Sequence, residues 1–173
     1  EEDAFRLIKK IFDYMPANNK ELPPKRPVPP GSEERIAKIL DFLPEKRTRT
    51  YDMHKIIECI VDGGEYLELK PNWGPMLITC LARINGEVVG IQASNPIVSA
   101  GATNTDALEK QTGFMVMCDS YNIPLIFLPD TPGHLTGKDA EYHRVGSRVV
   151  NQLQALYQVT VPKITVIIRK DYG

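Results

Sequence analysis

The turn Pro132-Gly133-His134 is the segment of the sequence best suited to bind a ligand. It follows the short apolar run 125–128 and precedes a helical pattern. Loops at the carboxyl ends of buried strands bind ligands in α/β folds. The glycine lets backbone approach a ligand, and amides at the start of the next helix could face an anion or a developing oxyanion. We therefore expect a site at this turn, although a Pro-Gly pair alone is more often only a turn.

Two other segments are weaker candidates for a site. The loop 99–103, which contains Ala100 and Gly101, consists of small residues just before a helical pattern. The run 169–173 carries charged residues after an apolar segment and includes Gly173. Taken alone, these patterns are typical of a tight loop and of a solvated strand exit.

The histidines do not indicate a metal centre or a nucleophilic site. His54, His134 and His143 are not spaced as metal ligands, and no Ser-His-Asp or Cys-His arrangement can be assembled from the sequence. We expect His54 and His143 at solvated, partly exposed helix positions. Only His134, inside the glycine turn, is expected to contact a site.

Composition argues against several functional classes. The formal net charge is −1 and the basic residues are scattered, so no nucleic-acid or membrane-surface partner is expected. Cys59, Cys80 and Cys118 stand far apart in apolar stretches, which is typical of reduced core thiols. No apolar run approaches the roughly 20 residues of a membrane helix, and no signal-peptide pattern opens the sequence. We expect a cytosolic protein, or one of an organelle matrix if a targeting segment is missing.

The first third of the sequence predicts helices joined by a linker. Residues 1–15 have one apolar stripe at helical spacing, and the six prolines of 16–30 predict an extended strap. A short helix capped by Ser32 is expected to bury Ile36, Ile39, Leu40 and Leu43 before Pro44. Another is expected to begin at Asp52 and to end at the Gly63-Gly64 pair.

The remaining sequence predicts an α/β sheet. Segments 65–69, 77–84 and 87–93 have strand patterns, and the last two flank Asn85-Gly86, which favours a type I′ hairpin. Asp106 and Glu109 suggest a capping box that opens a helix ending near Tyr121. Runs 125–128 and 164–168 predict strands buried on both faces, with a helix between them that carries Tyr142, Val145, Val149, Leu153 and Leu156. This order implies right-handed crossovers onto one shared sheet.

Read in order, these segments resemble the carboxyltransferase (beta) subunits of propionyl-CoA and related acyl-CoA carboxylases. The resemblance covers nearly the whole chain. It rests on Asp3 to Asn19, Tyr51-Asp52-Met53, Val61 to Glu65, Ala82 to Gly86, Val89-Gly90-Ile91, Asn95-Pro96, Cys118-Asp119, Asn122 to Leu125, Asp130, Pro132-Gly133, Thr160 to Thr165 and Arg169-Lys170.

The resemblance implies a crotonase-like (ClpP/crotonase) ββα superhelix, with this chain as the C-terminal, biotin-side half of such a subunit. Residues 1–15 then correspond to the last helix of a preceding N-terminal domain. Residues 16–50 correspond to a proline-rich linker with a short helix, and 51–173 to the carboxyltransferase C-terminal domain, cut short at its end.

The activity that the resemblance implies is transfer of a carboxyl group from biotin to the α-carbon of an acyl-CoA. Biotin is carried on a partner, so the implied partners are a biotin carboxylase, a biotin carboxyl carrier protein, acyl-CoA and further copies in a dimer or hexamer. The implied biotin-side residues are Pro132, Gly133, His134 and Gly173. Ala100 and Gly101 are expected to bind the substrate.

Two departures from the family pattern leave alternatives open. His134 stands where an aromatic residue usually follows Pro-Gly, and 147–151 replaces the usual Arg-His-Gly-Ala-Lys text. The alternatives are a biotin-dependent decarboxylase or transcarboxylase subunit, which runs similar chemistry, and a non-catalytic crotonase-like oligomerisation module.

Overall fold

The protein is built around one five-stranded sheet. The computed structural model describes residues 1–46 and 48–172. The strands follow the order β1-β2-β3-β4-β5; their bounds are β1 Tyr66–Glu68, β2 Leu77–Ile84, β3 Glu87–Ser94, β4 Leu125–Leu128 and β5 Lys163–Thr165. The first three strands are antiparallel, whereas β3, β4 and β5 run parallel to one another. The predicted mixed sheet and its two crossovers are therefore confirmed.

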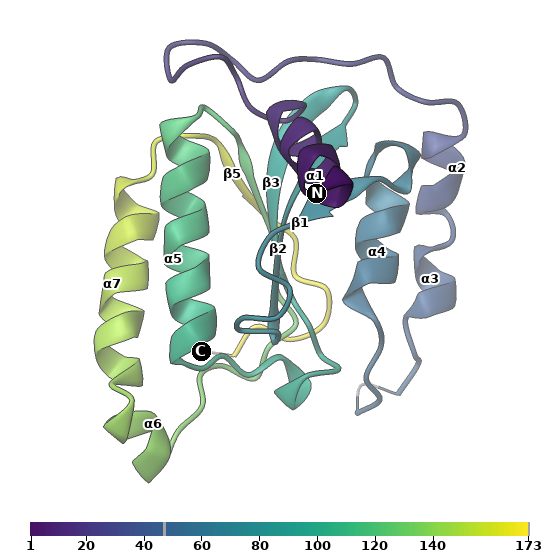
Figure 1. Cartoon of the computed structure of the whole chain (residues 1–173). Coiled ribbons are helices and arrows are strands. Elements are labelled where there is room, and N and C mark those ends of the chain that lie inside the picture. The colour runs from purple at the N-terminus through teal and green to yellow at the C-terminus, as the bar shows by residue number, and fades with distance from the viewer. Residues whose placement is uncertain (47, 173) are drawn as a thin grey trace.

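Helices cover both faces of this sheet (Figure 1). The helices are α1 (Glu2–Phe12), α2 (Ser32–Ile36), α3 (Ile39–Phe42), α4 (Met53–Ile60), α5 (Thr105–Ser120), α6 (Lys138–Tyr142) and α7 (Val145–Gln158). α5 and α7 lie on one side and α4 on the other, with α2 and α3 outside α4. Two short 3-10 turns, Asp62–Gly64 and Ser99–Gly101, complete the set.

The hairpin of β2 and β3 forms as predicted because its turn residues tolerate left-handed backbone. Asn85 and Gly86 both have positive φ, 53° and 79°, as a type I′ turn requires. Asp62 fixes the turn further, since its carboxylate accepts hydrogen bonds from the amides of Asn85 at 3.0 Å and Gly86 at 2.7 Å.

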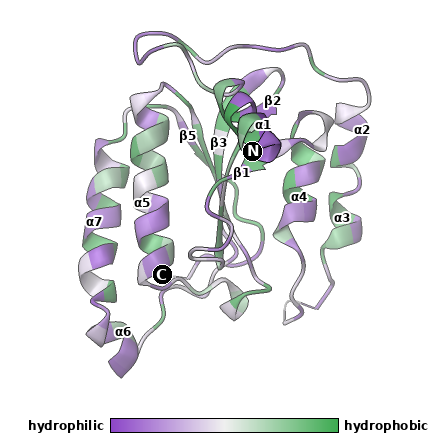
Figure 2. Ribbon diagram, viewed as in Figure 1, coloured by the Kyte–Doolittle hydropathy of each residue, from purple (hydrophilic) through white to green (hydrophobic). Residues whose placement is uncertain are grey.

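The alternation of side chains along the strands divides the core into two layers. Cys80 on β2 packs with Ile56 and Ile57 of α4, whereas the next residue, Leu81, packs with Phe114 of α5. In Figure 2 the helices on both sides of the sheet carry both hydrophobic and hydrophilic residues. The sheet is thus a central layer that needs a helix on each face.

The proline-rich segment 16–30 forms neither helix nor strand, as predicted, but it is anchored to the domain. It crosses one end of the sheet between α1 and α2 (Figure 1). The Arg26 amide donates to the Gly86 carbonyl at 3.1 Å, and the Asn122 side chain donates to the carbonyls of Asn19 and Glu21. On the stripe of α1, Ile11 packs against the core, whereas Phe5 and Phe12 are exposed.

Three local predictions about helices were wrong. α5 begins two residues earlier than the proposed capping box allows, because Asn104, not Asp106, accepts the cap hydrogen bond from the Ala107 amide. Left-handed backbone at Arg144, with φ 57°, separates α6 from α7, so Tyr142 is exposed and does not continue the stripe of α7. Gly31, not Ser32, occupies the N-cap position of α2.

Several side chains that were expected in the core lie on the surface instead. Ile36 and Leu40 are exposed on the outer helices, and Leu153 is exposed on α7. β5 is an edge strand, and its Ile164 is 59% exposed. The prediction that run 164–168 is buried on both faces is therefore wrong for this chain, because β4 is the only neighbour of β5 among the described residues.

Asp119 joins the end of α5 to the segment that leads into β5. Its Oδ1 accepts hydrogen bonds from the Thr160 amide at 2.7 Å, the Thr160 hydroxyl at 3.0 Å and the Val161 amide at 3.1 Å. Partial burial by itself raises the pKa of Asp119. The hydrogen bonds and the nearby Lys163 charge outweigh that effect, so the net pKa is below its ordinary value.

We expect Asp119→Asn to lower the free energy of unfolding by about 1 kcal/mol at neutral pH, a figure reduced for solvent screening at this partly exposed site. Because the folded-state pKa is depressed, the ionised carboxylate stabilises the fold above its unfolded pKa of about 4, and this is lost as the pH falls through the folded value. Urea denaturation between pH 7 and pH 3 measures both effects. Asp139→Asn, at an exposed position of α6, is the control, and equal losses for the two variants would contradict the prediction.

Candidate functional site

Two loops meet at the carboxyl ends of β3 and β4. Thr103 and His134 form an isolated parallel bridge, in which the Thr103 amide donates to the Gly133 carbonyl and the Leu135 amide donates to the Thr103 carbonyl. The Thr131 hydroxyl also donates to the Gly101 carbonyl at 2.7 Å. The structure therefore brings together the two small-residue loops that the sequence marked separately.

The chain that leaves β5 supplies a third wall. Thr131 bridges to Asp171, since the Thr131 amide donates to the Lys170 carbonyl at 3.0 Å and the Tyr172 amide donates to the Thr131 carbonyl at 3.3 Å. A cavity of about 220 Å³ lies where these walls converge. Its lining residues are Leu77, Gln92, Ser94, Thr103, Gln111, Phe127, Leu128, Pro129, Thr131, Gly133, His134, Gln152, Asp171 and Tyr172.

A buried ion pair fixes these loops relative to each other. Asp130 is fully buried, and its Oδ2 accepts a hydrogen bond from Nε of Arg169 at 2.8 Å. Nζ of Lys170 lies 3.7 Å from the other carboxylate oxygen, Oδ1. Because Asp130 precedes the glycine turn and Arg169 precedes the Asp171 wall, this pair joins two walls of the cavity.

Tyr51 and Arg49 complete the surroundings of Arg169. The Arg169 guanidinium lies 4.5 Å from the centre of the Tyr51 ring and donates to the Arg49 carbonyl at 2.9 Å. Burial, and then the adjacent Asp130 carboxylate, raises the pKa of Tyr51 well above its ordinary value, and Arg169 opposes that rise. The Tyr51 hydroxyl and Oδ1 of Asp130 are both buried, and neither has a hydrogen-bond partner within residues 1–46 and 48–172.

The predicted biotin-side residues divide into three groups. Gly133 and His134 line the cavity, whereas Pro132 is exposed and does not line it. Gly133 has φ 111°, and its amide donates to the Thr131 hydroxyl at 3.0 Å. Gly173 lies outside the described residues.

Of the predicted substrate residues, Gly101 is packed into the loop junction and Ala100 is exposed. Gly101 has φ 83°, and a Cβ atom there would lie 2.5 Å from the Asp130 carbonyl oxygen. Neither residue lines the cavity.

The amides of the glycine turn have partners within the protein. The amides of Gly133 and Leu135 are used inside the loop junction, and the residues at the start of α6 do not line the cavity. The amides at the start of α6 therefore do not face this cavity. α6 has only five residues, begins beyond Gly137 and lies outside the cavity.

His134 is held by Thr103. The Thr103 hydroxyl lies 2.6 Å from Nδ1 of His134. Burial lowers the pKa of His134 below its ordinary value and so favours the neutral imidazole. His134 can therefore donate or accept one hydrogen bond through its other nitrogen, according to its tautomer.

Three glutamines in the cavity wall were missed by the sequence reasoning. Gln92 comes from β3, Gln111 from α5 and Gln152 from α7. Gln92 stands among apolar residues in a strand of the sheet, and this polar interruption was a usable signal. Gln111 and Gln152 gave no comparable signal because polar residues are ordinary on helix faces.

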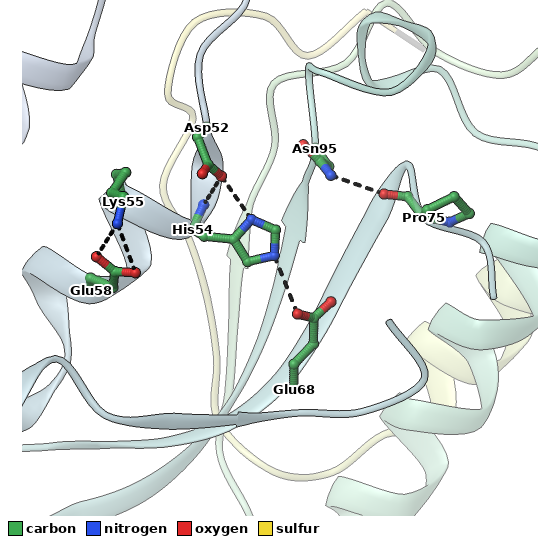
Figure 3. Close-up of polar contacts among 7 residues, drawn as sticks. All are labelled: Asp52, His54, Lys55, Glu58, Glu68, Pro75 and Asn95. Atoms are coloured by element: carbon green, nitrogen blue, oxygen red, sulfur yellow. Dashed lines mark hydrogen bonds and ion pairs between the residues drawn. The ribbon is translucent and has the colours of Figure 1, made fainter. Parts of the chain in front are cut away.

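The other histidines lie away from the cavity. His54 is partly exposed, as predicted, but it is held between two carboxylates: Nδ1 is 2.7 Å from Asp52 and Nε2 is 3.2 Å from Glu68 (Figure 3). This arrangement joins α4 to β1. Across the described ranges 1–46 and 48–172, no cluster of three or more potential metal-ligating side chains is present, and no helix is long and apolar enough to cross a membrane.

We expect Asp130→Asn to destabilise the protein by about 3 kcal/mol, because it leaves the nearly buried Arg169 cation without its countercharge. Removing both charges with Asp130→Asn and Arg169→Met should cost less than the sum of the two single changes. Urea denaturation of the four proteins in this double-mutant cycle measures the coupling. Strictly additive losses would show that the ion pair does not hold the loops together.

Comparison with known proteins identifies the family. The carboxyl transferase domain family matches residues 1–173. The chain is 40% identical, over its whole length, to 33% of the methylmalonyl-CoA carboxyltransferase 12S subunit of Propionibacterium freudenreichii subsp. shermanii. It is 37% identical, over 99% of its length, to 32% of the mitochondrial propionyl-CoA carboxylase beta chain of Sus scrofa.

A solved structure supports the same assignment. The hexameric transcarboxylase 12S, with hydrolysed methylmalonyl-coenzyme A bound, matches 96% of this chain with a TM-score of 0.91 and 38% identity, and the match spans 32% of that protein's chain. The fold is therefore the crotonase-like α/β fold of carboxyltransferases. The chain spans about a third of the length of these relatives, and it belongs to the carboxyl transferase domain family.

Proposed function

We propose that this chain forms the biotin-side half of an active site that transfers a carboxyl group between biotin and the α-carbon of an acyl-CoA. The observation that carries this proposal is the convergence of three segments on one cavity at the carboxyl ends of the parallel strands. The chain's membership of the carboxyl transferase domain family supports the chemistry.

The cavity suits a neutral, compact ring of the kind that biotin carries. Gly133 presents no side chain there, and the lowered pKa of His134 favours its neutral form. The cavity volume of about 220 Å³ corresponds to roughly seven water molecules at 30 Å³ each. Biotin supplies a carboxyl group bound to its ureido nitrogen, whereas the residues of this chain orient the ring and limit access of water to it.

The acyl-CoA is assigned mainly to a different half of the active site. Ala100 and Gly101 adjoin the biotin-side turn and are proposed to face the acyl thioester across it. The proposed partners are a biotin carboxylase, a biotin carboxyl carrier protein and further copies in a dimer or hexamer. The proposed location is the cytosol or an organelle matrix.

A transcarboxylase subunit is the second candidate. One relative is named as a methylmalonyl-CoA carboxyltransferase 12S subunit and matches the whole of this chain. Such an enzyme would use the same biotin-side residues with a different carboxyl donor. Assaying the complete carboxyltransferase with a biotin carboxylase and ATP, and separately with a methylmalonyl thioester as donor, distinguishes the two.

We expect Gly133→Val to raise the KM for free biotin at least tenfold in the complete carboxyltransferase, because the side chain would enter the cavity. Gly137→Val is a matched control, since Gly137 has φ 108° against 111° for Gly133 but has no heavy atom within 4 Å of an added Cβ. Backbone strain at positive φ should cost each variant about 1–2 kcal/mol of stability, so the biotin kinetics of the two are compared per amount of folded protein. Normal biotin kinetics in the folded fraction of Gly133→Val would contradict the site assignment.

We expect this chain alone to show no transfer of carboxyl groups from malonyl-type thioesters to free biotin. The acyl-CoA half is assigned to another part of the enzyme, and binding biotin alone does not lower the barrier. Activity should appear when the chain is combined with that half in the complete subunit. Turnover by the purified chain would refute the division of the site between halves.

A further inference from the structure

Gln92 carries a buried oxygen that has no hydrogen-bond partner within residues 1–46 and 48–172. The side chain is only 3% exposed, although it lines the cavity beneath the glycine turn. Its Nε2 donates to the Gln111 carbonyl oxygen at 2.9 Å. Oε1 has no hydrogen-bond partner among the residues that the structure describes.

The orientation of this amide is fixed by its surroundings. The Gln111 carbonyl can only accept a hydrogen bond, so the nitrogen of Gln92, not the oxygen, must face it. Oε1 is therefore an acceptor without a donor. Leaving such an atom unpaired costs free energy, and buried polar atoms without protein partners point to water or a ligand.

The rest of the lining limits the ligand that would supply the donor. Among the residues that the structure describes, no lysine or arginine lines the cavity, so the lining does not favour an anionic group. Among the described lining residues Asp171 is the one carboxylate, and it is exposed. Gln111, Gln152 and Ser94 add uncharged polar groups, and Leu77 and Phe127 add apolar surface. This chemistry fits a neutral, planar group with an N–H donor, such as an amide or a cyclic urea.

We propose that Gln92 is a specificity-determining residue that accepts a hydrogen bond from the ureido N–H of biotin. This rests on the proposed function, because that function places the biotin ring in the cavity. The ureido group has two nitrogens, and the nitrogen that does not carry the transferred carboxyl group keeps its hydrogen. Gln92 binds this N–H and thereby orients the reacting nitrogen away from the strand, toward the open side of the cavity.

The first test measures recognition without turnover. Saturation-transfer NMR on the complete carboxyltransferase compares 2-imidazolidinone, which has ureido N–H groups, with 1,3-dimethyl-2-imidazolidinone, which has none. We expect only 2-imidazolidinone to bind. Its saturation-transfer signal should be at least tenfold weaker with Gln92→Met than with the unchanged protein. Equal binding of both probes would overturn the proposal, and so would binding of neither, since the cavity would then hold water only.

The second test measures biotin kinetics. Gln92→Met keeps the length of the side chain but removes the acceptor, and we expect about a tenfold higher KM for free biotin with little change in kcat. Gln154→Met, at an exposed position of α7 outside the cavity, should leave both constants unchanged. If Gln92→Met does not fold, Gln92→Leu replaces it.

The outcomes separate the two proposals. Normal biotin kinetics in folded Gln92→Met, in an enzyme that carboxylates biotin, overturns the role of Gln92 and leaves the proposed function intact. Selective binding of 2-imidazolidinone in a protein that cannot transfer carboxyl groups to biotin keeps a urea-binding role for Gln92. That result refutes the proposed function, together with the assignment of biotin as the ligand.

Discussion

The loops around the cavity depend on one carboxylate that has no contact with solvent. An isolated ion in a protein interior is very costly, so Asp130 is stable there only because Arg169 and Lys170 supply positive charge beside it. Asp130 and Arg169 follow neighbouring parallel strands, so their attraction also fixes how the two strand exits lie. The backbone bonds between Thr131 and the segment 170–172 then follow from that placement.

This arrangement separates the charged part of the site from its neutral part. The ion pair is not part of the cavity lining, and Tyr51 packs against the guanidinium. The cavity itself is lined mainly by uncharged side chains, including Gln92 and His134. A charged scaffold therefore positions a surface that presents mostly neutral hydrogen-bonding groups.

The parts of the fold that could be predicted are those decided by neighbouring residues. The Asn85-Gly86 turn and the alternating strands on either side of it require only local backbone preferences and burial. The cap of α5 was predicted two residues too late because both Asn104 and Asp106 are good cap residues, and sequence spacing alone favoured the wrong one. The exposure of β5 depends on which other elements pack beside it, and the local sequence pattern does not contain that information.

The candidate site was only partly predictable for the same reason. Gly133 and His134 could be found from a glycine turn between a strand and a helix. The pairing of Asp130 with Arg169 spans 39 positions of sequence and required knowledge that β4 and β5 are adjacent. The convergence of three glutamines required the packing of α5 and α7 over the sheet.

The position of β5 at the sheet edge implies unequal protection of the backbone against hydrogen exchange. β3 has a strand on each side, so its amides can exchange only when the centre of the domain opens. The amides of β5 can exchange when β5 separates from β4. The segment that follows β5 forms the Asp171 wall of the cavity. Fraying of that edge would therefore open the cavity sideways while the hairpin and its two core layers stay folded.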